Sequence, residues 1–443
     1  MIKNKVTGLL PIKIISFFLF TLIIYNLNGR IIYTNDSTPA NFLPLSIIKE
    51  FNLDLNEFPF LYKDQLSYFL SSYKGHLYSN YSVITSILAV PVYLVPYYTG
   101  RIRDIPDVLF LAKLSASILA SLSVIFLLLA VLKLTNSEFK AFFIASLYAL
   151  ATSTWTISGQ ALWEHTSGQF FLAAALLFIV LVKDNLKHFY IAGIFSALAC
   201  VSRLNNTILV ICFTVFIVMR YKRRSWRFFI FPIIIAIWHF TLNFLYFGSF
   251  LGGTGVLTRQ AIFRQHVKGG FNGDILKGFL GILISPSRGL LIFSPWLIFC
   301  FLGIVLVWIK GYDLLFKCVS IGIVGTVLLF SKFTTWWGGL CYGPRYLVDM
   351  LPLLSIFTIF IIDEIRRRKI MAIIFGILII YSIGIQLIGA FFYSGDWYYS
   401  PTNVDHDHER LWDWNNNEII YSLKNGVQQP IFLPHLPSLF LQD

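Results

Sequence analysis

The sequence predicts an all-α, polytopic membrane protein with about 11 transmembrane helices. The 443-residue chain is 57% hydrophobic and 13% charged, whereas a soluble domain carries about 25% charged residues. Aromatic residues make up 17% of the chain, with 43 Phe and 22 Tyr, which suits lipid-facing helices and interfacial aromatic belts. Apolar runs of about 20 residues, the length that spans a bilayer, recur along the chain.

The formal net charge of +13 does not indicate nucleic-acid binding, because it comes largely from short Lys/Arg clusters between apolar runs. The positive-inside rule predicts such clusters in cytoplasmic turns. The five cysteines are scattered, and their spacing indicates neither a metal site nor a disulfide framework. The sequence also contains no P-loop and no glycine-rich dinucleotide motif.

The first element is the N-terminal apolar segment, which lacks a small-residue cleavage site and is therefore kept as a helix rather than a signal peptide. Two of the expected spans are short and form a hairpin that turns at Arg203–Asn206. In chain order the expected spans are 9–27, 106–132, 140–157, 165–182, 189–204, 206–219, 228–247, 290–309, 318–332, 346–362 and 370–392.

One further apolar run, 81–98, is ambiguous because it contains Pro91 and Pro96. If it crossed the membrane, several basic clusters would lie outside. If it only lies in the interface, the clusters fall together on the cytoplasmic side, as the positive-inside rule requires. We adopt the second arrangement, which places the N-terminus inside and the C-terminus outside.

This topology divides the chain into two parts. Residues 1–392 form a transmembrane catalytic module, and residues 393–443 form an extracytoplasmic tail. The first extracytoplasmic loop, 28–105, contains an amphipathic stretch that suits a helix lying on the membrane. Most of the unusual polar motifs fall on the outside face, which favours a function there.

Asp36 is the first acidic residue of the chain and follows the first span by a few residues. Pro39 then opens a new helical pattern, so Asp36 and Ser37 stand where a helix N-terminus is capped. Two interpretations stay open: a capping residue, or a carboxylate held at the membrane surface for chemistry on a bilayer-borne substrate.

Polar side chains also stand at two positions next to apolar helices. Glu164 and His165 follow Trp163 at a turn, where they would ligate a metal, orient a substrate or simply cap a helix. Arg203 interrupts an apolar run, and a guanidinium in a membrane segment costs roughly 2.5–3.5 kcal/mol. It either holds a phosphate through paired hydrogen bonds or extends to the interface.

The later loops supply further candidates. Trp336 and Trp337 precede Tyr342 and the sequence Gly-Pro-Arg345, which together suggest a rigid interfacial site for a sugar and an anion. The glycine-rich and basic segment 248–288 ends at Arg288 and is either a substrate lid or an ordinary solvated loop. The run Asp405–Glu409 either ligates a metal ion or is a solvated loop.

These residues resemble the GT-C superfold of lipid-linked-sugar glycosyltransferases, which includes protein mannosyltransferases, aminoarabinose transferases and a further bacterial branch. Asp36 matches the acidic residue of their first loop. The stretch Tyr78–Tyr81 is similar to a proline-bearing segment, with Asn80 at the position of a frequent lysine and without the prolines. Trp163–His165 lies where relatives carry a second acidic or polar group, and Gly-Pro-Arg345-Tyr resembles a late-loop motif of the bacterial branch.

The resemblance implies transfer of a sugar, with inversion, from a polyprenyl-phosphate donor to an extracytoplasmic hydroxyl of a lipid, glycan or protein. Asp36 would be the catalytic base. The implied location is the bacterial cell membrane, and a divalent metal ion is left open as a cofactor. The donor phosphate would be held by Arg203, Arg345 and Arg288, and the substrate-binding residues would be Glu164, His165, Trp336, Trp337, Tyr342 and Asn80.

Two other classes stay open. A lipid-sugar flippase or solute transporter would place charged residues along a path through the membrane. A structural membrane subunit would explain the helices, but not Arg203 or the Gly-Pro-Arg345 loop. Because the polar motifs gather on one face, the sequence favours the enzyme.

Overall fold

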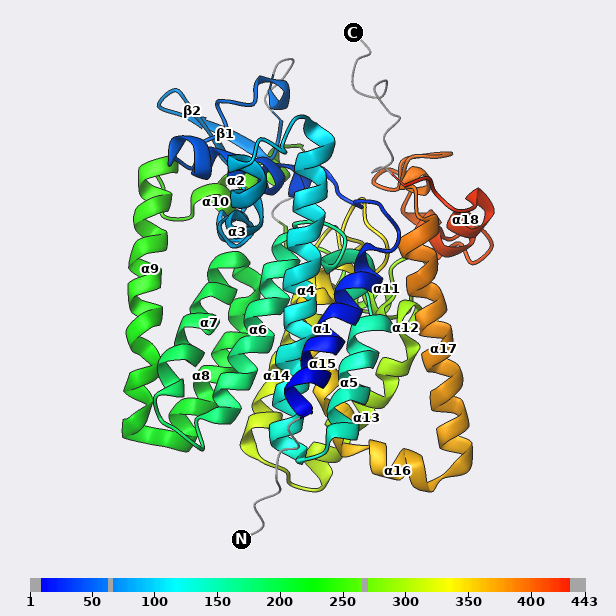
Figure 1. Ribbon diagram of the computed structural model, residues 1–443. Helices are drawn as coiled ribbons and strands as arrows, with labels where there is room; N and C mark the ends of the chain where they lie inside the picture. Colours follow the sequence, from blue (N-terminus) through cyan, green and yellow to red (C-terminus); the bar gives the residue numbers. More distant parts are fainter. Residues whose placement is uncertain (1–8, 63–66, 265–269, 431–443) are drawn as a thin grey trace.

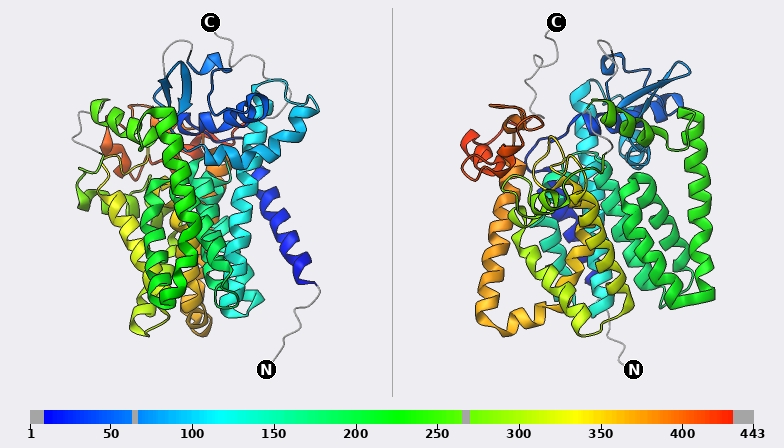
Figure 2. Two further views of the ribbon diagram at one scale, coloured as in Figure 1. Left: turned by 90° about the vertical axis from the view of Figure 1, so that its left-hand side faces the viewer. Right: turned by 180° about the vertical axis from the view of Figure 1, so that it is seen from behind.

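The computed structural model describes residues 9–62, 67–264 and 270–430 of the chain. It is mostly helical, with 72% helix and 2% strand. Long, roughly parallel helices form a bundle, and shorter elements cover one end of it (Figures 1 and 2). The bundle helices are α1 (Leu10–Asn26), α4 (Ile105–Thr135), α5 (Glu138–Leu150), α6 (Glu164–Leu181), α7 (His188–Ser202), α8 (Thr207–Tyr221), α9 (Trp226–Phe247), α13 (Ile298–Ile309), α14 (Leu314–Ser331) and α17 (Lys369–Phe392).

The shorter elements lie mostly in the loops between these helices. They are α2 (Thr38–Glu50), β1 (Leu70–Tyr73), β2 (His76–Ser79), α3 (Ile84–Tyr98), α10 (Gly252–Arg264), α11 (Ile275–Ile284), α12 (Leu290–Phe293), α15 (Leu351–Ser355), α16 (Ile362–Arg367) and α18 (Glu418–Asn425). The strands form an antiparallel hairpin that pairs Leu70 with Ser79. This hairpin in the first loop departs from the all-α prediction.

Several helical segments are long and apolar enough to cross a membrane, as an integral membrane protein requires. Within the described residues there are five: Ile105–Thr135, Glu164–Leu181, Leu204–Phe247, Leu314–Ser331 and Lys369–Phe392. The third comprises α8 and α9, which meet at the basic turn Lys222–Ser225. Further apolar helices, such as α1 and α7, are shorter. The count of about 11 spans therefore stays a prediction.

Three expected spans are not continuous helices. Residues 140–157 form α5, which ends at Leu150, and a separate π-helical turn at Thr154–Ser158. Residues 290–309 form α12 and α13, separated by a 3-10 turn at Pro295–Leu297. Residues 346–362 form short pieces, with α15 lying between the 3-10 turns Arg345–Met350 and Ile356–Phe360. Proline has no N–H and is best tolerated in the first turn of a helix. Pro295 and Pro352 each lie in the first turn of a new element, where the helical hydrogen bonding restarts.

The loop expected at 248–288 contains helices instead. In α11, Asp274 caps the N-terminus by accepting hydrogen bonds from the N–H groups of Leu276 at 2.8 Å and Lys277 at 3.0 Å. Gly278 lies so close to α14 that a Cβ there would come within 2.0 Å of the Ser331 carbonyl oxygen. α11 is thus a packed helix rather than part of a solvated loop, and residues 265–269 of the expected loop lie outside the described residues.

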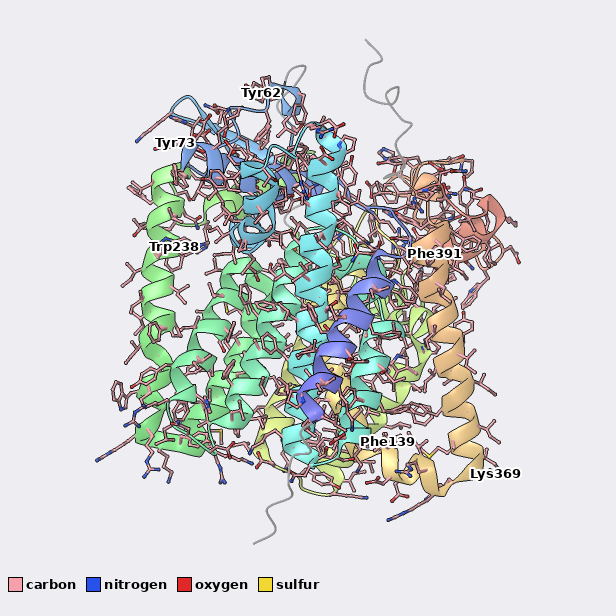
Figure 3. The ribbon with its side chains drawn as sticks, viewed as in Figure 1. Tyr62, Tyr73, Phe139, Trp238, Lys369 and Phe391 are labelled. Carbon is pink, nitrogen blue, oxygen red and sulfur yellow. The ribbon has the colours of Figure 1, made fainter. Side chains whose placement is uncertain are left out.

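The two ends of the bundle differ in character. The turns α4–α5, α6–α7, α8–α9 and α16–α17, where the basic clusters fall, lie at the lower end in Figure 1. Ion pairs join them there, including Lys133–Asp184 and Lys140–Asp363, both at 2.7 Å. Figure 3 labels Phe139 and Lys369 at this end and Tyr62 and Tyr73 at the other. The upper end carries α2, α3, the hairpin and α18.

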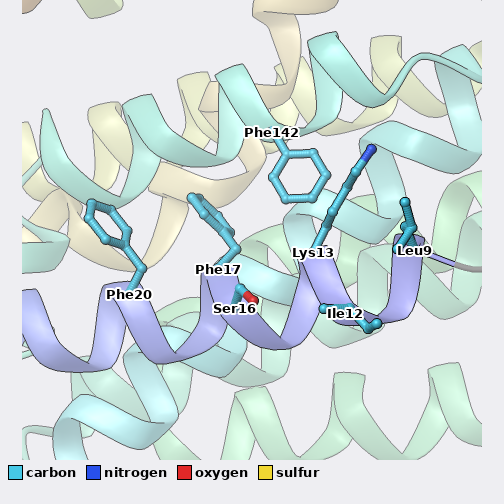
Figure 4. A pocket seen from close by; sticks show the side chains of 7 residues that line it. All are labelled: Leu9, Ile12, Lys13, Ser16, Phe17, Phe20 and Phe142. Atoms are coloured by element: carbon cyan, nitrogen blue, oxygen red, sulfur yellow. The ribbon is translucent and has the colours of Figure 1, made fainter.

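A surface groove lies near the lower end, between α1 and α5 (Figure 4). It has a volume of about 460 Å³ and is lined mainly by apolar side chains such as Phe17, Phe20 and Phe142. Lys13 also lines it, and its ammonium is paired with Glu138 at 2.7 Å. The groove is therefore distant from the polar residues singled out by the sequence, which lie at the upper end.

Candidate functional site

Asp36 and Arg345 meet at the upper end of the bundle although they are 309 residues apart in the chain. Arg345 Nη1 donates to Asp36 Oδ2 at 2.7 Å, and the Tyr68 hydroxyl donates to Asp36 Oδ1 at 2.5 Å. Asp36 does not cap a helix. The turn Asn35–Ser37 is capped instead by Thr34 and Ser37, whose side chain accepts from the Thr34 N–H at 3.3 Å.

The surroundings of Asp36 favour its ionised form. Burial raises its pKa, but the charge of Arg345 and hydrogen bonds from Tyr68 and Tyr81 outweigh burial. The pKa of Asp36 consequently lies below its ordinary value. Tyr68 and Tyr81 both come from the first loop and were not among the candidates, because a tyrosine near a membrane surface is ordinary.

A second ion pair joins Arg203 to Asp349. Arg203 ends α7 in an extended conformation, and its guanidinium donates to Asp349 Oδ2. It also lies 2.9 Å from His165 Nδ1, which in turn lies 3.3 Å from Asp349 Oδ2. The Arg203 side chain is only 9% exposed. It therefore points into the protein and does not extend to the interface.

Asp349 was missed because it lies within the apolar stretch 346–362. The sequence did contain a signal for Asp349, because an acidic residue inside an expected span is costly and usually has a function. Gly168 in α6 makes room for it, because a Cβ there would lie 2.5 Å from Asp349 Oδ1.

The segment Trp163–His165 connects the two ion pairs. The Arg345 guanidinium lies 5.0 Å from the centre of the Trp163 ring, and the Trp163 and His165 rings are 6.3 Å apart. Glu164 lies between them in sequence, within electrostatic range of Asp36 and Arg203. Its Oε1 accepts a hydrogen bond of 2.5 Å from the Ser82 N–H. The structure thus brings Asp36, Arg203 and Arg345 around one short segment.

Asn80 supports the first loop at this site. Its side-chain amide donates to the Tyr68 carbonyl at 2.8 Å and accepts from the Ser71 hydroxyl at 2.6 Å. Asn80 thereby positions Tyr68, which contacts Asp36, while its own polar groups are used within the protein.

Arg288 lies in a second cluster, which contains the tail. It forms a fully buried ion pair with Glu418 at 2.5 Å and also donates to the Gly339 carbonyl at 3.3 Å. Glu418 Oε2 accepts in addition from the Gly343 N–H at 3.1 Å. The pair holds α18 against the loop that carries Arg345, so residues 393–430 of the expected tail are folded onto the bundle (Figure 1), whereas 431–443 lie outside the described residues.

The remaining aromatic candidates belong to this second cluster as well. The Tyr342 hydroxyl donates to the Ile385 carbonyl of α17 at 3.0 Å. Trp337 Nε1 donates to Asp405 at 2.9 Å, and its ring lies 4.3 Å from that of His408. Trp336 and Trp337 line a small cavity of about 80 Å³, together with Asp274, Lys277 and His408 among others.

Lys113 in α4 is a buried lysine that was not among the candidates. Its Nζ donates to Gln160 Oε1 at 2.5 Å, and that oxygen also accepts from Asn28 at 2.7 Å. No carboxylate pairs with Lys113 within the part of the chain that the structure describes. A lysine within an apolar run was a detectable signal of such a residue.

No group of three or more His, Cys, Asp or Glu side chains is placed to hold a metal ion among residues 9–62, 67–264 and 270–430. In the tail, Asp405 accepts a hydrogen bond from Trp337 Nε1, and Asp407 accepts a hydrogen bond of 2.8 Å from the Thr402 hydroxyl. The candidate site therefore consists of two linked ion pairs with Glu164 beside them.

Searches with protein-family models and among curated proteins found no match to this chain.

Proposed function

We propose that the protein is a membrane glycosyltransferase that moves a sugar from a polyprenyl-phosphate donor to an acceptor hydroxyl with inversion. The observation that carries this proposal is the cluster itself: two carboxylates and two guanidiniums from distant parts of the chain surround Trp163–His165. Such a grouping of charge beside apolar helices is costly and marks a functional site.

The arrangement suits a substrate whose leaving group is a phosphate. A leaving phosphate needs cations rather than a protein acid, and the acceptor hydroxyl needs a base. Arg345 uses Nη1 for Asp36, while its Nε is buried without a hydrogen-bond partner. A guanidinium has five N–H donors, so Arg345 retains donors for a substrate anion. Arg203 is the second cation of the proposed donor site.

The proposed location is a bacterial cell membrane, with the site on the extracytoplasmic side. The basic turns lie at the opposite end of the bundle from α2, which directly follows Asp36 in the chain (Figure 1), and the positive-inside rule assigns such turns to the cytoplasm. An enzyme on the outer side has no supply of nucleotide sugars, so its donor arrives through the bilayer. The proposed acceptor is a lipid, glycan or protein.

Radiolabelled sugar transfer from a polyprenyl-phosphate donor, measured in membranes with and without the chain, tests the proposal. Asp36→Asn should abolish transfer without changing insertion or abundance, because it removes the charge that orders Arg345. Asp363→Asn is the matched control, since Asp363 pairs with Lys140 at the other end and is 56% exposed. Full transfer by the Asp36→Asn variant would remove this site from the proposal.

A further inference from the structure

We propose that Glu164, rather than Asp36, accepts the proton of the acceptor hydroxyl, and that Asp36 serves to hold Arg345. This inference rests on the proposed function and assigns the two acidic candidates different roles in it. Three features of the cluster support this assignment. They are the hydrogen bonds that each carboxylate already makes, the exposure of each carboxylate, and the pairing of the acidic with the basic groups.

Asp36 is fully engaged. Oδ2 receives the Arg345 guanidinium at 2.7 Å and Oδ1 receives the Tyr68 hydroxyl at 2.5 Å. A third hydrogen bond comes from Tyr81. Donors and a cation that stabilise a carboxylate make it a weaker base, because protonation must break those interactions. Asp36 is thus built to stay ionised rather than to take up a proton.

Glu164 is engaged on one side only. Oε1 accepts from the Ser82 N–H at 2.5 Å, which fixes the orientation of the carboxylate. Oε2 makes no hydrogen bond to any described residue, and Glu164 as a whole is half-buried rather than closed off. No arginine or lysine nitrogen of the described residues pairs with it. One of its oxygens is therefore free for a hydroxyl group.

Within this cluster, Asp349 is the other acidic side chain with an oxygen that makes no hydrogen bond, and its burial excludes it as the base. Its Oδ1 has no hydrogen-bond partner, but the side chain is only 4% exposed and the oxygen faces Gly168. An acceptor hydroxyl cannot reach it without a rearrangement of α6. Among the acidic groups of this cluster, Glu164 alone combines a free oxygen with access.

Charge balance points to the same residue. Arg345 is neutralised by Asp36, and Arg203 by Asp349. Glu164 is the third carboxylate, and it lies within electrostatic range of Asp36, Asp349 and Arg203. Once the two pairs have formed, neither arginine is left to pair with Glu164, which in its ionised form would carry an unbalanced negative charge. Uptake of the acceptor proton would neutralise that charge while the departing phosphate gains one.

In the proposed step, the acceptor oxygen forms a bond to the anomeric carbon of the sugar, and its proton passes to Glu164 Oε2. The bond between the anomeric carbon and the phosphate oxygen breaks, and its electron pair leaves with the phosphate, next to Arg345 and Arg203. The product is the glycosylated acceptor with inverted configuration, and Glu164 later returns its proton to solvent.

The test compares Glu164 and Asp36 variants in the transfer assay. Glu164→Gln keeps the acceptor for the Ser82 N–H but cannot take a proton, so kcat should fall by about 10²–10⁴-fold with the donor KM unchanged. In Glu164→Ala, added formate should restore part of kcat because it supplies a small carboxylate in the vacated space. Asp36→Ala should gain nothing from formate, because its defect is a displaced Arg345.

Each outcome bears on the inference. Wild-type kcat in Glu164→Gln, or rescue of Asp36→Ala instead of Glu164→Ala, overturns it while the proposed function stands. Loss of kcat in Glu164→Gln without formate rescue of Glu164→Ala makes Glu164 a positioning residue and likewise overturns it. Absence of transfer by the wild-type protein overturns the proposed function itself. A melting curve of each purified variant identifies losses that come from unfolding.

Discussion

At the residue scale, each of the three arginines that the sequence singled out is paired with its own carboxylate. The pairs are Asp36–Arg345, Asp349–Arg203 and Glu418–Arg288. A buried charge without a partner is strongly destabilising, so the pairing lets guanidiniums stand beside apolar helices. The three ion pairs differ in the residues that surround them. The first two lie around Trp163–His165, whereas the third is enclosed by the tail.

Gly168 provides a sharp test of the Arg203–Asp349 pair. In Gly168→Ala the new Cβ would lie 2.5 Å from Asp349 Oδ1 and 2.8 Å from Asn206 Nδ2, so the carboxylate must move. We expect sugar transfer to fall at least about tenfold, which corresponds to about 1.4 kcal/mol. The measurement is kcat/KM for the donor in purified protein.

Gly376→Ala in α17 is the matched control, because nothing lies within 4 Å of the added Cβ. Alanine favours a helix over glycine by about 1 kcal/mol, so neither substitution weakens its own helix. Equal activity of the two variants would show that the position of Asp349 has no influence on the reaction.

At the element scale, helix ends and short turns position the site, while the long helices provide the frame. Glu164 and His165 begin α6, Arg203 ends α7, and Arg345 and Asp349 share one 3-10 turn. Helix ends leave unpaired backbone N–H and C=O groups that lipid cannot satisfy, so they lie at the ends of the bundle among polar side chains. This explains why the polar residues gather at one level of the bundle.

The tail is an element whose attachment can be tested through Arg288 and Glu418, which are 1% and 0% exposed. Arg288→Met leaves the Glu418 carboxylate buried without its cation, and loss of one partner of such a pair costs about 3–5 kcal/mol. We expect a clear drop in the melting temperature of the detergent-solubilised protein, and partial recovery when Glu418→Gln is added.

Arg367→Met is the control for this experiment, because the Arg367 side chain is 75% exposed and its pairing with Glu364 at 3.6 Å is solvated. Its melting temperature should stay close to that of the wild type. If Arg288→Met melts like Arg367→Met, the buried pair does not hold the tail.

At the scale of the whole molecule, the bundle is polar at both ends in different ways. The lower end has basic turns joined by ion pairs, and the upper end has the candidate site, the hairpin and the tail (Figures 1 and 2). Much of the lateral surface of α9 and α17 is exposed and apolar, which suits contact with lipid. This asymmetry underlies the proposal of a one-sided reaction.

The sidedness can be measured with a membrane-impermeant thiol reagent. Lys74 in the hairpin turn and Arg223 in the α8–α9 turn are both exposed and lie at opposite ends. We expect Lys74→Cys to react in intact cells and Arg223→Cys to react only after permeabilisation. The wild type is the control for its native cysteines, which are buried or half-buried. The reverse pattern would place Asp36 at the cytosolic face and remove the argument for a lipid-borne donor.

Parts of the fold and the site follow from local sequence. Apolar runs marked most bundle helices to within a few residues, and the hairpin turn at Arg203 lies where the sequence expected it between α7 and α8. Pro295 and Pro352 each predict a break in a helix, but hydropathy averaged over the whole apolar run predicted a continuous span instead. Asp349 was hidden for the same reason, because one carboxylate barely changes the mean of an apolar segment.

The sequence by itself determined a helical chain with membrane-length apolar segments, and it singled out Asp36, Arg203 and Arg345, because hydropathy and the cost of burying charge are properties of single positions and short runs. Only the tertiary structure decided which charges meet. Arg345 and Arg288 look alike in sequence, each in a loop next to proline or glycine. One reaches Asp36 across 309 residues and the other reaches Glu418 across 130 residues. The physical reason is that ion pairs depend on distances of a few ångströms, which packing of remote segments sets and local sequence does not.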